Sequence, residues 1–505
     1  PGWRSAGFGW STEHRESKQG SITKVNFMQS SSCIGIFMGK RTRPTFFRRE
    51  LCHPPPPRRA WKMVGLVVGS GVCIVGTILY SIPFTTSTSI VITMENKPTS
   101  LSTSPDVKQE EEEPCPLVIP EFPSVDEVLV PPNIETLRTA LASPTTFCFP
   151  SVAERVQYYM GGWTEFRSVN ITEHCDNIWY YQQKANRTWW YNHLLLVDQQ
   201  PLPPPGSSSD YDFTNQYLND YFGTIFPLLP QRPTDDPSSP PYRVLTALGD
   251  ARSQFPLPVL VKTRMASRAR QGDFKEDPII LPLETGRHFH QPFGYWKENQ
   301  PDRPWKEKKE TLVWRGVTTG VRLGIIEAFV KKYGATGEQS PLTTGLFDIG
   351  FTALVQLKDH AREQELYQYL VREPQSFEEQ LSHKYLLSIE GNDVASGLKW
   401  MLFSNSVVFM PIPTCVSWAM EELLLPWYHY VPVREDLMDL GEKILWCQAH
   451  DAECETISRH ATQFMKDLWM SQQAKNDGEA VVQQIMEKYM AWYEHELQSC
   501  VFTTT

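Results

Sequence analysis

The sequence predicts an α/β protein whose parallel sheets are flanked by helices and which follows an N-terminal transmembrane helix. From about residue 242 onward, β-prone apolar runs alternate with segments of helical spacing, a pattern typical of parallel sheets covered by helices. Before that region, residues 63–82 (MVGLVVGSGVCIVGTILYSI) carry no charge over a length that can cross a bilayer as a helix. With 505 residues, of which 41% are hydrophobic, the chain can form two to four domains.

Charged residues are distributed unevenly about this apolar segment. Residues 1–62 contain twelve Lys/Arg and three Asp/Glu, whereas the other 443 residues contain 36 and 55, so the formal charge of -10 divides into +9 and -19. An acidic body argues against a nucleic-acid-binding protein. Arg58, Arg59 and Lys62 directly precede the segment, and the next charge after it is Glu95. The positive-inside rule therefore predicts a basic cytosolic tail over 1–62 and a lumenal body.

We therefore expect a single-pass type II protein of the Golgi or endoplasmic reticulum membrane, with residues 63–82 as the signal-anchor. Two alternatives stay open: a helix buried in a core, and a signal peptide in a chain whose translation starts at Met63. Two sequons, at Asn170 and Asn186, lie after the segment and are expected N-glycosylation sites.

Cysteine usage agrees with a lumenal body. Seven of the ten cysteines follow the apolar segment, and no spacing among them matches a zinc site, so disulfides are expected rather than a metal. Cys447 and Cys454 are the nearest pair and could close a short loop. The odd number leaves at least one thiol free or intermolecular.

The region between the membrane segment and the α/β region is expected to hold a stem. Residues 83–145 are rich in Ser, Thr and Pro, include the acidic run 110–113, and show no sustained hydrophobic period. Aromatic residues crowd 157–191, where core packing is favoured over stacking on sugar rings. Residues 200–242 are again rich in Pro, Ser and Asp and are expected to form a surface loop.

Each element of the α/β region is predicted from its periodicity and its end signals. The expected strands span 242–247, 257–262, 311–314, 385–389, 407–410 and 430–433. The expected helices span 320–333, 361–371, 392–403, 417–425, 437–449, 453–470 and 478–499.

Two of these strands end in a charged residue followed by a glycine, which lets a ligand approach the backbone closely. The strand at 311–314 ends in Arg315-Gly316, and Gly320 and Arg322 open the next helix. Ligands bind beyond the carboxyl ends of strands in α/β sheets, and helix N-termini favour anions. Lys384, just before the strand that ends in Glu390-Gly391, is a further candidate cation. The constellation suits a diphosphate, although the alternative of surface arginines in a turn stays open, since neither the P-loop nor the GxGxxG pattern is present.

Several longer segments, in this order, resemble glycosyltransferase family 90, which includes capsule-associated xylosyltransferases and protein O-glucosyltransferases. They are LVWRGVTTGVR at 312–322, HKYLLSIEGNDVASGLKWML at 383–402, SNSVVFMP at 404–411 and LPWYHYVPVREDLMDLGEKILW at 425–446. The similarity covers about residues 242–470, and the stem and the basic tail lie outside it.

The resemblance implies a glycosyltransferase B type fold, in which two Rossmann-like domains face a cleft. We expect an N-terminal acceptor domain over 146–310, a nucleotide-sugar-binding domain over 311–470 and a C-terminal helix over 471–505. The resemblance also implies inverting, metal-independent transfer of a sugar, glucose or xylose, from a UDP-sugar to a hydroxyl of a protein or glycan. No cofactor is expected beyond the donor substrate. The residues carried over as donor-binding are Arg315, Gly316, Thr319, Arg322, Lys384, Ser388, Glu390 and Gly391.

The family's general base is an aspartate near the end of a strand in the first domain. TALGDARS at 246–253 matches that strand end and points to Asp250. An inverting transfer needs one base to take the proton of the attacking hydroxyl, and it needs cations or N–H groups to stabilise the departing UDP. The family usually has an aromatic residue and Pro after this aspartate, whereas Ala251-Arg252 follow here. A turn carboxylate is the structural alternative for Asp250.

Two other classes of function compete with a transferase. The altered context of Asp250 allows a non-catalytic lumenal binding protein on the same fold. A glycoside hydrolase with two carboxylates would act without a nucleotide sugar. Cations at the ends of the strands argue against the hydrolase.

Overall fold

The computed structural model describes ten segments of the chain. They are residues 119–121, 124–144, 146–180, 194–198, 213–229, 242–250, 252–269, 274–283, 302–341 and 343–499. The predicted tail, signal-anchor and most of the stem, together with the sequon at Asn186, lie outside these segments. Within the described segments, no helix combines the length and the apolarity needed to cross a membrane.

A five-stranded sheet in the second half of the chain is parallel throughout, as predicted. Its strand order is β12-β10-β9-β7-β8. The strands are β7 (Lys309–Val317), β8 (Phe347–Ala353), β9 (His383–Leu387), β10 (Val407–Met410) and β12 (Val431–Pro432). The sequence did not predict β8, and β7 is longer than expected.

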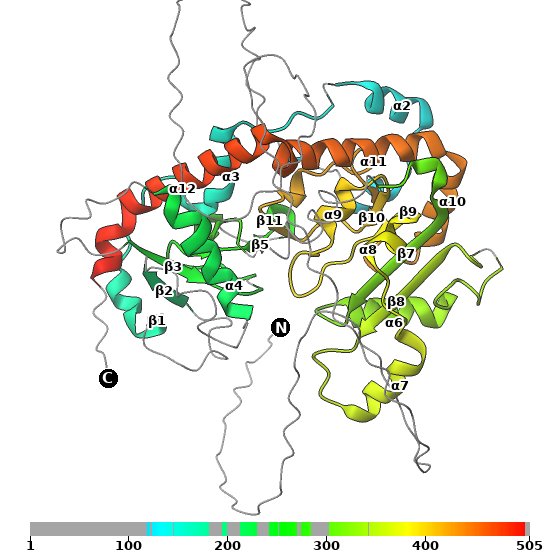
Figure 1. Ribbon diagram of the computed structural model, residues 1–505, viewed down its shortest axis with the longest axis horizontal. Helices are drawn as coiled ribbons and strands as arrows, with labels where there is room; N and C mark the ends of the chain where they lie inside the picture. The colour runs from blue at the N-terminus through cyan, green and yellow to red at the C-terminus, as the bar shows by residue number, and fades with distance from the viewer. Residues whose placement is uncertain are drawn as a thin grey trace, which may run out of the picture. The chain divides into compact units, whose positions relative to one another are not determined.

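Both faces of this sheet are buried, which explains why its strands are continuous apolar runs. Consecutive residues of β7, Leu312 and Val313, point to opposite faces and belong to two different core clusters. The helices that cover the sheet alternate with its strands along the chain (Figure 1). They are α6 (Arg322–Tyr333), α7 (His360–Leu370), α8 (Phe377–Leu381), α9 (Leu398–Phe403), α10 (Leu440–Ala449) and α11 (Asp451–Met465).

The first sheet is mixed, not parallel. Its order is β1-β2-β3-β4-β6, and β2 runs antiparallel to β3, with Val197 opposite Val244. The strands are β1 (Ile178–Tyr180), β2 (Leu194–Asp198), β3 (Arg243–Ala247), β4 (Leu260–Val261) and β6 (Ile279–Ile280), with α3 (Val152–Met160) and α4 (Phe213–Asp220) in the same part of the chain. The prediction of parallel sheets is wrong here because an apolar run shows that a strand is buried and not which way it runs.

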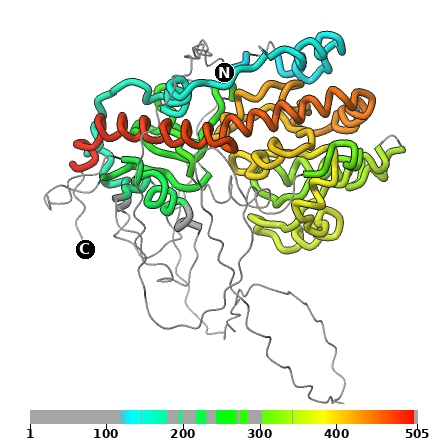
Figure 2. The backbone as a smooth tube through the Cα atoms, turned by 45° about the horizontal axis from the view of Figure 1, so that its top comes forward, coloured from blue at the N-terminus to red at the C-terminus, as the bar shows by residue number. Residues whose placement is uncertain are grey.

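Strand pairing and helix packing are among the contacts that join the parts of the chain that carry the two sheets. Strand β5 (Thr263–Met265) pairs antiparallel with β11 (Cys415–Ser417). Helix α12 (Gln472–Gln498) continues beyond α11 and packs along the first sheet, where the Leu245 N–H donates to Tyr489 Oη at 3.0 Å (Figures 1 and 2). All the described residues belong to one compact unit, and the two-domain arrangement with a cleft stays a prediction.

Part of the predicted stem is folded. Helices α1 (Val125–Leu129) and α2 (Ile134–Ala142) lie within 83–145, and α2 packs beside α11 (Figure 1). Leu137 and Leu141 are buried in the core beside the second sheet, and Arg138 Nε lies 2.7 Å from Glu453 Oε1. Helices this short, separated by prolines, give no sustained hydrophobic period, so the sequence placed the end of the stem too late.

The helix predicted over 417–425 is reduced to a short 3₁₀ helix, Glu421–Leu423. Strand β11 occupies its start, and Met420 follows with a left-handed φ of 50°, which ends regular structure. The Ser417 N–H donates to Glu421 Oε2 at 2.6 Å, so a side chain satisfies a group that a helix would leave unpaired.

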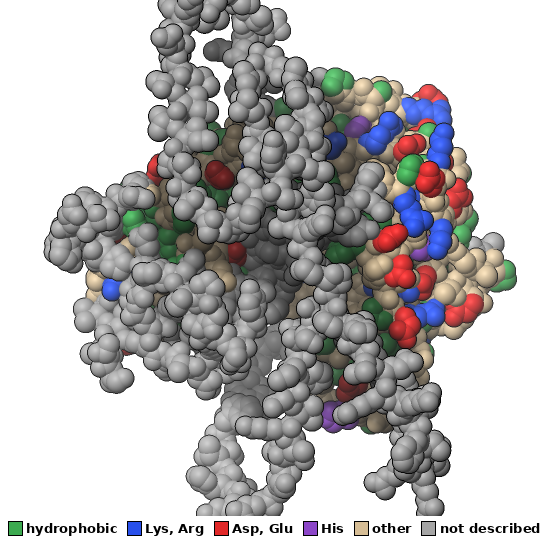
Figure 3. Space-filling model, in the orientation of Figure 1, with side chains coloured by type: hydrophobic (Ala, Val, Ile, Leu, Met, Phe, Trp, Pro, Cys, Tyr) green, Lys and Arg blue, Asp and Glu red, His purple; other side chains and the backbone are tan. Residues whose placement is uncertain are grey.

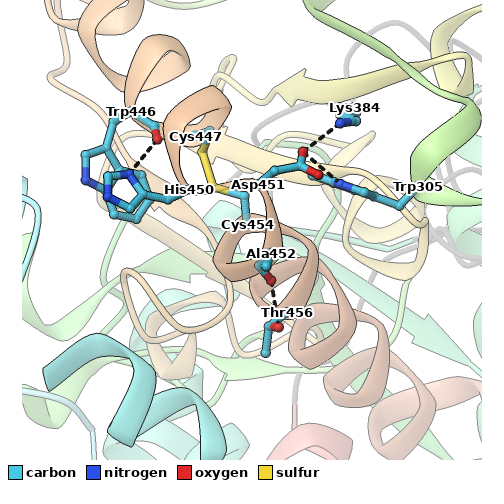
Figure 4. The surroundings of a disulfide bond; sticks show 9 residues. All are labelled: Trp305, Lys384, Trp446, Cys447, His450, Asp451, Ala452, Cys454 and Thr456. Carbon is cyan, nitrogen blue, oxygen red and sulfur yellow. Dashed lines mark hydrogen bonds and ion pairs between the residues drawn. A yellow bond between two sulfur atoms is a disulfide. The ribbon is translucent and has the colours of Figure 1, made fainter. Parts of the chain in front are cut away.

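Helices α10 and α11 are joined by the disulfide expected between Cys447 and Cys454, whose Cα atoms are 5.8 Å apart (Figure 4). We expect Cys447→Ala/Cys454→Ala to lower the free energy of unfolding by about 2–3 kcal/mol, the chain-entropy value for so short a loop. Urea denaturation under oxidising conditions measures the loss. In excess reductant the wild type and the variant should unfold at nearly the same urea concentration, and a difference that persists there would contradict the cross-link as its cause.

Candidate functional site

A cavity of about 500 Å³ opens at the carboxyl ends of the second sheet. Strand β8 pairs with one edge of β7, and the next strand along the chain, β9, pairs with its other edge. The strand order therefore reverses between β7 and β9. Ligands of α/β proteins bind outside the carboxyl ends of the strands at such a point. The lining residues are Arg252, Val321, Ile325, Ser388, Ile389, Glu390, Val394, Ala395, Leu398, Met410–Thr414, Glu421, Glu435 and Asp436.

The segments that follow β7 and β9 meet closely at one wall of the cavity. Gly320 has a φ of +59°, and a Cβ there would lie 2.1 Å from the carbonyl oxygen of Gly391. Only glycine allows this conformation and approach. Arg322 joins the same segments, because its Nε and Nη2 donate to the Ile389 carbonyl at 3.1 and 2.7 Å and its Nη1 donates to Thr319 Oγ1 at 3.1 Å.

Arg322 therefore has a structural task at the wall. Burial lowers the pKa of its guanidinium to about 10. It does not line the cavity, and its three nitrogens are engaged with protein oxygens. Arg322 thus connects the start of α6 to the segment after β9. Its position gives no direct support for the predicted contact with the donor.

Ser388 and Glu390, predicted as donor-binding, both line the cavity. The Ser388 N–H donates to the Phe409 carbonyl at 2.9 Å, which fixes this residue beside the end of β10. Glu390 Oε1 accepts from the N–H groups of Thr414 and Cys415 at 2.8 and 3.0 Å, and Oε2 accepts from the Thr414 hydroxyl. Burial raises the pKa of Glu390. Glu390 thus fixes the chain after β10 to the chain after β9.

Arg252 supplies a cation to the cavity that the sequence did not identify. Its Nε donates to the Asn392 carbonyl and its Nη2 to the Gly391 carbonyl at 3.3 Å, and its side chain is 36% exposed. Among the described residues, Nη1 makes no hydrogen bond, so it can donate to a ligand. In the sequence, Arg252 stands out only as a departure from the family pattern after Asp250 and as a charge that follows a strand.

Asp250, the predicted base, lies beside the loop that forms the cavity wall. It follows the carboxyl end of β3 after Gly249, whose φ is 101°. Its Oδ1 accepts from Lys262 Nζ at 2.8 Å and its Oδ2 from Asn392 Nδ2 at 3.0 Å. The carboxylate is 20% exposed, so a substrate can reach it. The structure brings Asp250 together with Gly391 and Glu390 through Asn392.

Arg315 does not line the cavity. Its Nη2 pairs with Asp348 Oδ2 at 2.7 Å, its Nη1 donates to the carbonyls of Trp314 and Asp348, and its Nε donates to the Glu373 carbonyl. These partners occupy the guanidinium of Arg315 and hold it against β8. Its position therefore gives no support for the expected contact with the diphosphate. At Gly316 a Cβ would lie 2.6 Å from the Trp314 ring, so packing explains this glycine without a ligand.

Lys384 lies at the opposite edge of the sheet from the cavity, because it stands at the start of β9. Its Nζ pairs with Asp451 Oδ1 at 2.6 Å and with Glu310 Oε1 at 2.9 Å, and it lies 5.1 Å from the Trp305 ring centre. Figure 4 shows it beside the disulfide helix α11, with Asp451 also bonded to Trp305. These partners give Lys384 a structural role, and its position offers no support for the predicted contact with the donor.

The exposure of one sequon and the distribution of surface charge bear on two of the predictions. Asn170 is exposed at the start of a short helical turn, as an N-glycosylation site requires. On the face drawn in Figure 3, basic side chains lie among acidic ones over the second half of the chain. This interspersed pattern differs from the basic stripe of a nucleic-acid interface.

Comparison with known proteins assigns the class. The sequence model of the family described as glycosyl transferase family 90 matches residues 287–484. The O-glucosyltransferase LpsA of Dichelobacter nodosus is 33% identical over 285 residues, which are 56% of this chain and 76% of that protein. Protein O-glucosyltransferase 2 of Danio rerio is 34% identical over 123 residues, 24% of each chain, and human Protein O-glucosyltransferase 3 is 29% identical over 89 residues, 17% of each chain.

An α/β protein with a cavity at a strand-order reversal belongs to the broad class that binds nucleotides or sugars there. The chain belongs to glycosyltransferase family 90 and is a glycosyltransferase. The family match contains all the cavity residues from Val321 to Asp436. Asp250 and Arg252 precede it, so their roles depend on the geometry of this chain.

Proposed function

We propose that this glycosyltransferase moves a sugar, glucose or xylose, from a UDP-sugar to a hydroxyl group of a protein or glycan, with inversion and without a metal ion. The observation that carries the proposal is the cavity between β7 and β9, which has a cation, Arg252, on one side and the proposed base, Asp250, just beyond the same loop. The proposal includes the glycosyltransferase B arrangement of two domains about a cleft.

In this proposal the UDP moiety occupies the cavity. Val321 and Ile325 place the first turn of α6 against it, and a helix N-terminus attracts phosphate oxygens. Arg252 adds a charge-assisted hydrogen bond from Nη1. Ile412 and Leu398 offer apolar surface for the uracil ring, and Glu435 and Asp436 offer acceptors for the ribose hydroxyls.

The transfer itself needs one proton acceptor. The acceptor hydroxyl oxygen forms a bond to the anomeric carbon from the face opposite the phosphate, while the bond from that carbon to the phosphate oxygen breaks. The hydroxyl proton goes to the carboxylate of Asp250. Charge that develops on the departing UDP is stabilised by Arg252 and by the N-terminus of α6.

We further propose that the reaction takes place in the lumen of the Golgi or endoplasmic reticulum. The apolar segment 63–82 would anchor the chain with residues 1–62 in the cytosol. The exposed sequon at Asn170 and the disulfide of α10 and α11 support an oxidising, glycosylating compartment.

A donor screen with the purified full chain tests the proposal. UDP release with each UDP-sugar should be fastest with UDP-glucose or UDP-xylose and should require an acceptor. Addition of EDTA should change the rate by less than about twofold, because cationic side chains replace the metal at the diphosphate. Activity that returns only with added Mn²⁺ would contradict metal independence, and transfer in any arm would exclude a purely non-catalytic binding protein.

A further inference from the structure

A buried lysine lies between two carboxylates at the edge of the cavity. Lys262 Nζ is 2.8 Å from Asp250 Oδ1 and 3.0 Å from Asp393 Oδ2, and its side chain is 4% exposed. On its third side lies the ring of Tyr217, with the ring centre 5.9 Å from Nζ. Lysine is almost never this buried unless it is paired. Burial alone would lower the pKa of Lys262, but Asp393 and Asp250 together raise it, so the side chain is an ammonium at neutral pH.

The backbone fixes the position of this ammonium from both sheets. Lys262 is the single residue between β4 of the first sheet and β5, which pairs with β11. Asp393 comes from the loop after β9 in the second sheet, and its Oδ2 also accepts from Thr263 Oγ1 at 2.9 Å. The lysine is therefore held by residues on both sides, independently of Asp250.

Asp250 is in turn held by Lys262 and Asn392, one on each carboxylate oxygen. Without Lys262, the carboxylates of Asp250 and Asp393 would face each other with no cation between them, which disfavours ionisation. Other charged groups in the surroundings are Arg252 and Glu390, whose side chains are 4.0 Å apart, and Arg322, which interacts with the charges of Asp393 and Glu390.

We propose that Lys262 is a positioning residue for sugar transfer: its ammonium, anchored by Asp393, holds the carboxylate of Asp250 ionised and oriented at the edge of the donor cavity. The inference rests on the proposed role of Asp250 as the base. It adds a third residue to the machinery, and it assigns Asp393 to the support of that residue.

Four variants of the full chain test this inference: Lys262→Met, Lys262→Arg, Asp393→Asn and Asp250→Asn. For each, the dependence of kcat/KM on pH, the Kd for UDP and the Tm are measured. Lys262→Met should lower kcat at neutral pH by roughly 100-fold, with the Kd for UDP within about threefold of wild type. Its acidic limb should move up by roughly 1–3 pH units, because the cation that favours the ionised carboxylate is gone.

Asp393→Asn should move the acidic limb of the kcat/KM profile to lower pH. The variant removes the negative charge of Asp393, so the ammonium of Lys262 favours the ionised form of Asp250 more strongly. Lys262→Arg should restore part of kcat. Lys308→Met is the matched control, since Lys308 is a buried lysine whose Nζ lies 2.7 Å from Asp302 Oδ1 away from the cavity. This control should lower Tm and leave the pH limbs of the folded enzyme unchanged.

An acidic limb at its wild-type position in Lys262→Met and in Asp393→Asn, with Asp250→Asn inactive, would overturn the role of Lys262 and leave the proposed function intact. If Lys262→Met does not fold, Asp393→Asn and Lys262→Arg decide by the same limb. A fully active Asp250→Asn would refute the base itself, and the role of Lys262 with it.

Discussion

Asp250→Asn should lower the turnover number for sugar transfer by roughly 10²–10⁴-fold and leave the affinity for UDP nearly unchanged. The amide cannot accept the hydroxyl proton, whereas it has almost the same shape as the carboxylate. Asp250 is not among the residues that line the cavity, so its loss leaves the donor pocket intact. Calorimetric titration with UDP and a steady-state assay with the best donor from the screen measure the two quantities.

The control for Asp250→Asn is Asp359→Asn. Asp359 is an exposed aspartate that caps α7 by accepting from the N–H groups of Ala361 and Arg362. Asparagine caps helices about as well, so this variant should keep both turnover and stability. Turnover of Asp250→Asn within a few-fold of wild type would show that another group takes the proton.

Arg252→Ala should weaken the binding of UDP by roughly 10- to 100-fold, the loss expected for charge-assisted hydrogen bonds. Its guanidinium is the cation on the wall of the cavity with a nitrogen left for a ligand. The affinity for uridine, which has no phosphate, should be nearly unchanged. The ratio of the two Kd values therefore reports on the diphosphate alone.

Arg315→Ala is the matched comparison, because the sequence pointed to this arginine. Its side chain is 7% exposed and pairs with Asp348, so its loss should lower the free energy of unfolding by roughly 1–3 kcal/mol and leave UDP binding unchanged. The reverse outcome, weaker UDP binding in Arg315→Ala and normal binding in Arg252→Ala, would return the diphosphate contact to Arg315.

The second sheet was largely predictable because its strands are buried on both faces. Continuous apolar runs at 385–389 and 407–410 correspond closely to β9 and β10. Strand β8 was missed because Asp348 and Gly350 interrupt its apolar run. Both have tertiary reasons: Asp348 pairs with Arg315, and a Cβ at Gly350 would lie 2.1 Å from the side chain of Arg372. Such reasons involve residues far along the chain, which local patterns do not contain.

In the candidate site, too, local patterns predicted some features, whereas other features depend on residues far apart in the sequence. Ser388 and Glu390 line the cavity, which agrees with their predicted position at the carboxyl end of a buried strand. Lys384 lies near the start of β9, and residues that begin a parallel strand lie at the edge of the sheet away from the cavity. A charge after a strand was the one local signal for Arg252, and nothing local singled out Lys262, because the partners Asn392 and Asp393 lie more than 100 residues away.

The return of α12 to the first sheet has a consequence for how the chain folds as it is synthesised. Tyr489 reaches the backbone of Leu245 across 244 residues, and Val481, Ile485 and Tyr493 are buried in the core that contains β3. At ribosomal speeds of about 5–20 residues per second, β3 waits on the order of 10–50 s for this helix. Until then its apolar face has no cover, so the nascent first half is a natural client for lumenal or cytosolic chaperones, and its folding ends only when the last helix has been made.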